Sequence, residues 1–84
     1  MADIRAVCAA VKAPVNFMAG YKGCRFMVAE LAAAGVKRIS LAASLYRAAL
    51  TGVDAAAREI AEQGTFGYAD RILTTPEIAP LFRA

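Results

Sequence analysis

The chain contains no histidine and no tryptophan, and it has only two cysteines. Without histidine, acid–base catalysis by an imidazole is excluded. Cys8 and Cys24 stand far apart without CxxC spacing, so the usual ligand set of a zinc site is missing as well. We expect both cysteines to be small buried apolar residues in a reducing compartment, and their spacing gives no support for a disulfide.

The chain also has no uncharged run near the roughly 20 residues that a membrane-spanning helix needs. Its N-terminus carries Asp3 and Arg5 and no long apolar run, which argues against a signal peptide. The net charge of +3 comes from scattered basic residues, with Lys37–Arg38 as the single adjacent pair. A nucleic-acid-binding protein would need a basic face. We therefore expect a cytoplasmic protein that binds neither membranes nor nucleic acid.

Apolar residues are abundant: they make up 60% of the 84 residues, against about 45–50% in ordinary soluble domains. A chain of this length forms one small domain, residues 1–84, and buries only roughly 60–65% of its unfolded surface. The surplus apolar surface is then expected to be covered by a partner chain or by another part of the same protein.

Helix and strand signals alternate along the chain. Apolar residues recur at helical spacing after Asp3, which could cap a first helix, and Pro14 prevents that helix from continuing. The later glycines Gly35 and Gly64 are natural helix ends. The predicted elements are a helix from Asp3, a strand in "PVNFMA", a helix over Cys24–Ala34, a strand in "KRISLA", a helix over Ser44–Gln63 with Ser44 as N-cap, and short helical turns near Tyr68–Leu73 and Pro76–Phe82.

The order is α-β-α-β-α with a helical tail, which predicts an α/β fold with a parallel strand–helix–strand crossover. The second strand is nearly continuously apolar after Arg38, as in parallel strands that are covered on both faces. Two parallel strands leave both edges and much of both faces open. We therefore expect this unit to be incomplete without further strands or partner chains.

Polar side chains are rare in the two predicted strands, and the exceptions are Asn16 and Ser40. In parallel α/β folds, ligands gather at the carboxyl ends of strands. Two interpretations stay open: the two side chains point into one pocket and bind an acidic substrate, or Asn16 bonds a neighbouring loop and Ser40 fits a tight place. Lys22 and Arg25 could meet an anion nearby or could be solvated, and backbone N–H groups at Ala43–Leu45 could add an anion site.

The stretches "PVNFMA", "VAELAAAGVKRISLAASLYRAAL" and "AAAREIAEQGTF" resemble the last part of the isocitrate lyase / phosphoenolpyruvate mutase superfamily. The likeness is greatest to the carboxyphosphonoenolpyruvate phosphonomutase branch, and it covers about Asp3 to Phe66. The resemblance implies a (β/α)8 TIM barrel, of which this chain would be the last two βα units and the tail. It also implies a Mg²⁺-dependent lyase or phosphonomutase that cleaves or rearranges a C–C or P–C bond of a small 2-oxo or phosphono acid.

By the same resemblance, Asn16 matches a seventh-strand asparagine that contacts a substrate acid group, and Ser40 lines the same pocket from the eighth strand. The loop "AGYKGCRF" departs from the Pro-Gly loop common in this branch, which puts the contacts of that loop in doubt. No residue here matches the family's acidic Mg²⁺ ligands, its mobile catalytic loop or its substrate-binding arginine. We therefore expect no catalytic residue, metal ligand or cofactor in this chain, and no activity from it alone.

In the family, the eighth helix often packs on a neighbouring subunit, which implies that this chain forms a homo-oligomer through the Ser44–Gln63 helix. An alternative of another class stays open. In that hypothesis the chain is a small, alanine-rich, self-associating interaction module without catalytic activity. The discriminating feature is the pocket: Asn16 and Ser40 facing one cleft at adjacent strand ends would favour the barrel piece, whereas strands remodelled into helices or swapped between chains would favour the module.

Overall fold

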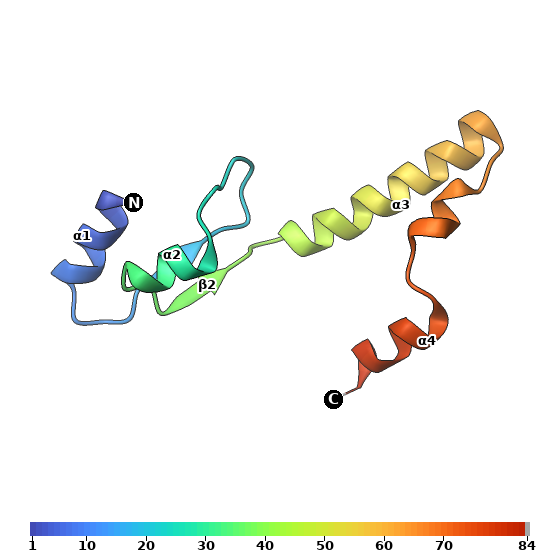
Figure 1. Cartoon of the computed structure of the whole chain (residues 1–84). Coiled ribbons are helices and arrows are strands. Elements are labelled where there is room, and N and C mark those ends of the chain that lie inside the picture. The colour runs from blue at the N-terminus through green and yellow to red at the C-terminus, as the bar shows by residue number, and fades with distance from the viewer. Residues whose placement is uncertain (84) are drawn as a thin grey trace. The chain divides into compact units, whose positions relative to one another are not determined.

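The computed structural model describes residues 1–83, which divide into two compact units between Ala48 and Ala49. The elements follow one another in the order shown in Figure 1. They are α1 (Ala2–Ala10), β1 (Asn16–Met18), α2 (Val28–Ala33), β2 (Arg38–Ser40), α3 (Ser44–Gln63), the 3₁₀ helix η1 (Gly67–Arg71), α4 (Thr75–Ile78) and the 3₁₀ helix η2 (Ala79–Phe82). The predicted α-β-α-β-α order with a helical tail is therefore confirmed.

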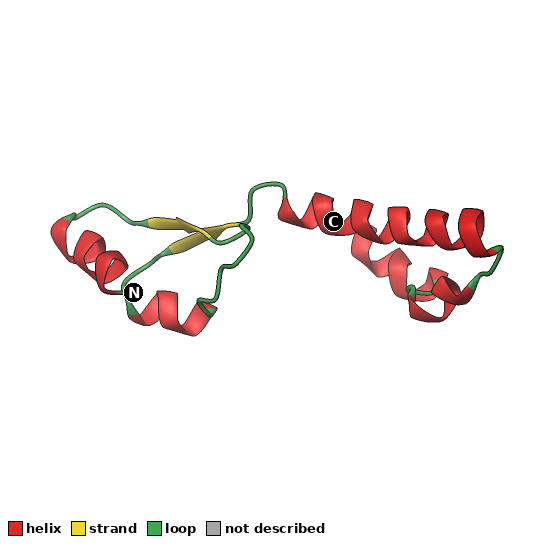
Figure 2. Ribbon diagram, turned by 90° about the horizontal axis from the view of Figure 1, so that it is seen from above, coloured by secondary structure: helices red, strands yellow, loops and turns green. Residues whose placement is uncertain are grey.

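The sheet of the first unit consists of the two predicted strands, which pair in parallel (Figure 2). Asn16 lies opposite Arg38, and Met18 lies opposite Ser40. The pairing continues past β1, where Ala19 N–H donates to the Ser40 carbonyl at 2.8 Å. Side chains alternate between the faces of a strand. Asn16 and Met18 therefore share a face with Arg38 and Ser40, whereas Phe17 and Ile39 occupy the opposite face.

The buried core of the first unit surrounds the end of α2 and consists of Leu31, Ala34 and Val36. Gly35 ends the helix with φ +107°. Its N–H bonds the Ala32 carbonyl, and the Val36 N–H bonds the Leu31 carbonyl, both at 3.0 Å. This is the Schellman arrangement, in which the residues at the two ends of the longer bond also pack together. The predicted helix end at Gly35 is confirmed.

The start of α1 differs from the prediction. Met1 occupies the N-cap position, and the Arg5 N–H bonds the Met1 carbonyl at 3.1 Å. Asp3 therefore lies inside the first turn and makes no side-chain capping bond. A carboxylate there still favours the helix, because it faces the positive end of the helix dipole. The prediction that a helix begins near Asp3 was correct, but the assignment of Asp3 as the capping residue was wrong.

Helix α2 begins at Val28, four residues later than predicted. The segment before it is drawn toward the sheet, because the Phe26 ring lies edge-on against Phe17 with centroids 5.7 Å apart. Such edge-to-face pairs are favourable in addition to the apolar area that they bury. Glu30 then closes the helix start by accepting a hydrogen bond from the Met27 N–H at 2.8 Å. Tertiary ring packing overrode the local helical pattern at Cys24–Met27.

The second unit is built on α3, whose bounds agree with the prediction. Gly64 ends the helix at φ +65°, and its N–H bonds the Ile60 carbonyl at 3.0 Å. The tail folds back onto the helix at Glu59. The carboxylate of this residue accepts the Tyr68 N–H at 3.1 Å and pairs with Arg71 at 4.0 Å. Ser44 is the first helical residue rather than the N-cap, because the Arg47 N–H bonds the Ala43 carbonyl.

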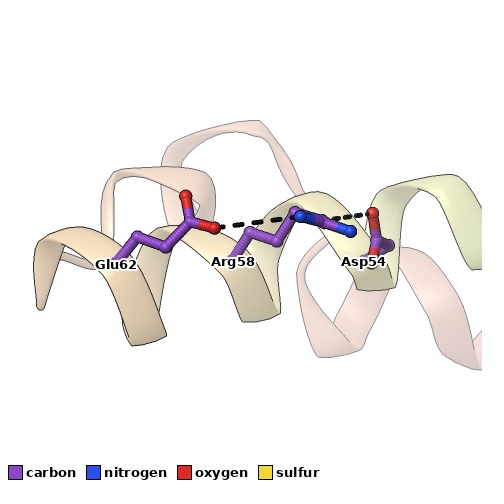
Figure 3. A network of polar contacts seen from close by, with 3 residues as sticks. All are labelled: Asp54, Arg58 and Glu62. Carbon is purple, nitrogen blue, oxygen red and sulfur yellow. Dashed lines mark hydrogen bonds and ion pairs between the residues drawn. The ribbon is translucent and has the colours of Figure 1, made fainter.

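Helix α3 has one polar and one apolar face, and none of its residues is buried. On the polar face, Arg58 lies between Asp54 at 2.9 Å and Glu62 at 3.8 Å (Figure 3). All three side chains are exposed, so each pair adds only a few tenths of a kcal/mol, by a rough estimate. Across residues 1–83, no helix combines the length and the apolar composition that crossing a bilayer requires.

Candidate functional site

The two strand residues singled out in the sequence meet in the structure. The Asn16 side-chain Nδ2 donates a hydrogen bond to the Ser40 Oγ at 3.0 Å. The parallel register produces this contact. Ser40 lies opposite Met18, two residues beyond Asn16, so that Asn16 and Ser40 are diagonal neighbours on one face of the sheet. Asn16 is exposed and Ser40 is half-buried, so both polar groups are accessible from solvent. The hydrogen bond brings the two side chains together, whereas a shared pocket and a role in substrate binding stay predictions.

A third residue joins this pair and was missed in the sequence. The Arg38 guanidinium Nη1 donates to the Asn16 Oδ1 at 3.1 Å. The alternation of side chains along a strand could have identified Arg38, because it stands two residues before Ser40 and therefore lies on the same face of the sheet. Within residues 1–83, Arg38 forms no ion pair. Arg38, Asn16 and Ser40 are called the polar triad below.

Two loops approach each other closely at the carboxyl ends of the strands. Gly20 follows β1, and a Cβ placed on it would lie 2.0 Å from the Leu41 carbonyl oxygen and 2.8 Å from the Ser44 Oγ. Only a glycine allows the two backbones to come this near. Ala42 then turns the chain from β2 toward α3 with φ +50°. A left-handed alanine costs about 1–2 kcal/mol, so the surrounding contacts must hold this turn in place.

The predicted anion site at Ala43–Leu45 is partly occupied by the protein itself. The Ser44 N–H donates to the Leu41 carbonyl at 3.0 Å, which removes one of the three proposed donors. The prediction overlooked this bond because the turn that closes it depends on the left-handed Ala42. The start of α3 is therefore a weaker anion site than expected.

The charged loop residues Lys22 and Arg25 are exposed in the segment between β1 and α2. In the described part of the chain, no hydrogen bond or ion pair connects either of them with the polar triad. Beside them, a hydrogen bond with the Cys24 side chain raises the pKa of the Tyr21 phenol above its ordinary value. Tyr21 is therefore uncharged at neutral pH, and the loop's charge comes from its two basic residues.

The cysteines Cys8 and Cys24 are both free thiols. They are half-buried, whereas we expected them to be buried. Cys8 packs against the end of α2, since a Cβ on Gly35 would lie 2.9 Å from the Cys8 Cβ. Residues 1–83 contain no group of three His, Cys, Asp or Glu side chains that could hold a metal ion.

Comparison with known proteins relates the chain to one family model and to solved structures. The family model described as phosphoenolpyruvate phosphomutase matches residues 1–61. The crystal structure of a candidate lyase/mutase from Burkholderia cenocepacia J2315 is similar to this chain at 41% sequence identity and a TM-score of 0.84. The similarity covers 99% of this chain and 30% of the other, so the chain spans less than a third of that protein's length. No curated protein matches the chain.

Proposed function

Since the chain belongs to the phosphoenolpyruvate phosphomutase family, we propose that it supplies part of the substrate pocket of a lyase or phosphonomutase. The substrate would be a small 2-oxo or phosphono acid, and the reaction would cleave or rearrange its C–C or P–C bond. In this proposal the chain forms the last two βα units of a (β/α)8 barrel. The family match confirms the resemblance found in the sequence and supports a lyase/mutase-like α/β piece.

The observation that carries this proposal is the hydrogen bond between Asn16 and Ser40. An amide and a hydroxyl at adjacent strands can both donate to the oxygen atoms of one carboxylate or phosphonate. Bonds to an ionised acceptor are stronger than those between neutral groups. These two residues would bind and orient the acid group, while the bond-breaking step and the family's Mg²⁺ would depend on residues outside this chain.

Direct titration of the full chain with phosphonopyruvate tests the proposal. Asn16→Asp places a carboxylate where the proposed donor was, and Arg38 can still hold that carboxylate in place. We expect this variant to weaken binding at least tenfold, which is about 1.4 kcal/mol. Isothermal titration calorimetry gives the dissociation constants.

Gln63→Glu is the matched control, because it makes the same amide-to-acid change at the end of α3. Binding by this variant should equal that of the wild type. A wild-type chain that gives no heat of binding would contradict the proposal, and so would equal affinities of the wild type and Asn16→Asp.

A second candidate, homo-oligomerisation through α3, is favoured by a different observation. Val53 and Ile60 are exposed, and they line an apolar hollow of about 650 Å³ between α3 and η1 with Ala49, Gly52, Ala56, Tyr68 and Ile72. Exposed apolar residues continue into the tail, where Phe66 and Phe82 lie largely in solvent. Large exposed apolar surface of this kind marks interaction sites in soluble proteins. We infer that a second copy of the chain covers it.

Sedimentation velocity of the chain and of one charged variant tests this inference. Val53→Glu places a carboxylate on the apolar face of α3, where Val53 is 65% exposed, and should shift the chain toward monomer. Ala61→Glu adds the same charge to an exposed position outside the hollow and should sediment like the wild type. A wild-type chain that sediments as a single monomeric species would refute self-association.

A further inference from the structure

The amide of Asn16 has a definite orientation in the polar triad. Its Oδ1 faces Arg38 at 3.1 Å, and its Nδ2 faces Ser40 at 3.0 Å. Ser40 does not decide this orientation, because a hydroxyl can donate as well as accept. Arg38 does decide it, since a guanidinium carries only donors and would oppose the N–H groups of a reversed amide. The arginine therefore selects which end of the amide points along the sheet toward Ser40.

The donors that remain define what the triad can bind. One Nδ2 hydrogen of Asn16 is used by Ser40, and the other has no partner among residues 1–83. The Ser40 oxygen accepts from the amide, so its own hydrogen is free to donate. The Asn16 amide hydrogen and the Ser40 hydroxyl hydrogen are therefore the donors left over, and the Asn16 Oδ1 is turned toward Arg38.

From this arrangement we propose that Arg38 is a positioning residue: it holds the Asn16 amide with its oxygen toward Arg38, so that the amide N–H and the Ser40 hydroxyl face the ligand, which makes the site selective for an oxyanion. The proposal rests on the function inferred above and adds to it the residue that sets the selectivity. Without Arg38, the amide can rotate and present its oxygen to the ligand. In the fraction of molecules with the reversed amide, an anion would then face the Asn16 oxygen, and the anion would bind more weakly on average.

Side-chain amide spectra of the ligand-free chain test the orientation. Asn16 and Gln63 carry the only two side-chain amide groups in the sequence, so a ¹⁵N-correlated spectrum contains two NH₂ pairs, and Gln63 is an internal control. We expect a nuclear Overhauser contact between the Asn16 NH₂ protons and the Ser40 β-protons. Arg38→Met should weaken this contact, Arg38→Lys should retain most of it, and Gln63 should not change. An undiminished contact in Arg38→Met would overturn the positioning role.

A double-mutant cycle with phosphonopyruvate tests how Arg38 acts on binding. If it acts through the amide, Arg38→Met weakens binding about tenfold in the wild type and has little effect in an Asn16→Ala background. Arg38→Lys should recover most of the loss. Arg5→Met, which removes one positive charge from α1, should leave the affinity within about twofold. Equal losses in both backgrounds would mean that Arg38 contacts the ligand directly and would overturn the proposal.

The two proposals fail in different ways. If the wild-type chain does not bind phosphonopyruvate, the proposed function is wrong and the selectivity claim falls with it, while the ligand-free spectra still decide the orientation of Asn16. If the chain binds and the cycle is additive, the proposed function stands and the positioning role of Arg38 is wrong.

Discussion

Gly20→Ala should unfold the region where the two strands end. The added Cβ would lie 2.0 Å from the Leu41 carbonyl oxygen and 2.7 Å from its carbonyl carbon, so backbone rather than a flexible side chain must move. Overpacking in a tight place typically costs about 1–3 kcal/mol and occasionally more. We expect a loss of about 3 kcal/mol. A unit with only three buried residues has little stability in reserve.

Hydrogen exchange at the Ala19 amide measures this loss, since its bond to the Ser40 carbonyl closes the sheet next to Gly20. Protection there should largely disappear in Gly20→Ala, and phosphonopyruvate binding should weaken with it. Gly52→Ala is the matched control. Its Cβ would meet nothing within 4 Å, and in the middle of α3 the change should stabilise the helix by about 1 kcal/mol. Normal Ala19 protection in Gly20→Ala would contradict the close approach of the loops.

Leu31→Ala is the second change with a large expected effect. Leu31 is 1% exposed and is the one fully buried large side chain of the described residues. Truncating a buried leucine to alanine costs about 2–5 kcal/mol, because the lost contacts leave a cavity. Leu31 and Val36 are both buried, and a backbone bond joins them in the Schellman turn that precedes β2. We therefore expect both the end of α2 and the strand pairing to become unstable.

Urea unfolding together with exchange at the Val36 amide measures the effect, because this amide bonds the Leu31 carbonyl. Val28→Ala makes a comparable truncation in the same helix at a side chain that is 70% exposed. That control should change stability by no more than about 0.5 kcal/mol. Equal effects of the two substitutions would mean that α2 is not anchored through Leu31.

Much of the local structure was predictable from the sequence. The bounds of α3, Ser44–Gln63, and the helix ends at Gly35 and Gly64 follow from apolar spacing and from glycine's access to positive φ. The predictions were wrong where residues distant in the sequence, or an unusual backbone turn, change the local structure. Helix α2 starts late because Phe26 packs on Phe17, and the donor at Ser44 is lost to a turn that the left-handed Ala42 makes possible.

The candidate site was predictable only in part. Asn16 and Ser40 stand out as polar residues within apolar strands, which is visible in the sequence. Arg38 was overlooked because it lies at the edge of the apolar run, and its contact with Asn16 spans 22 residues of sequence. That contact exists only because the strands pair in parallel with Asn16 opposite Arg38.

The sequence by itself determined the order of helices and strands, the glycine-dependent helix ends and the residues that place the chain in its family. These features depend on the periodicity and conformational freedom of neighbouring residues, which are local properties. The tertiary structure alone decided that the Asn16 amide bonds both Arg38 and Ser40 and that Gly20 must approach the Leu41 backbone. Both depend on the register of two strands separated along the chain, and the hydrophobic pattern and the connection between the strands set that register.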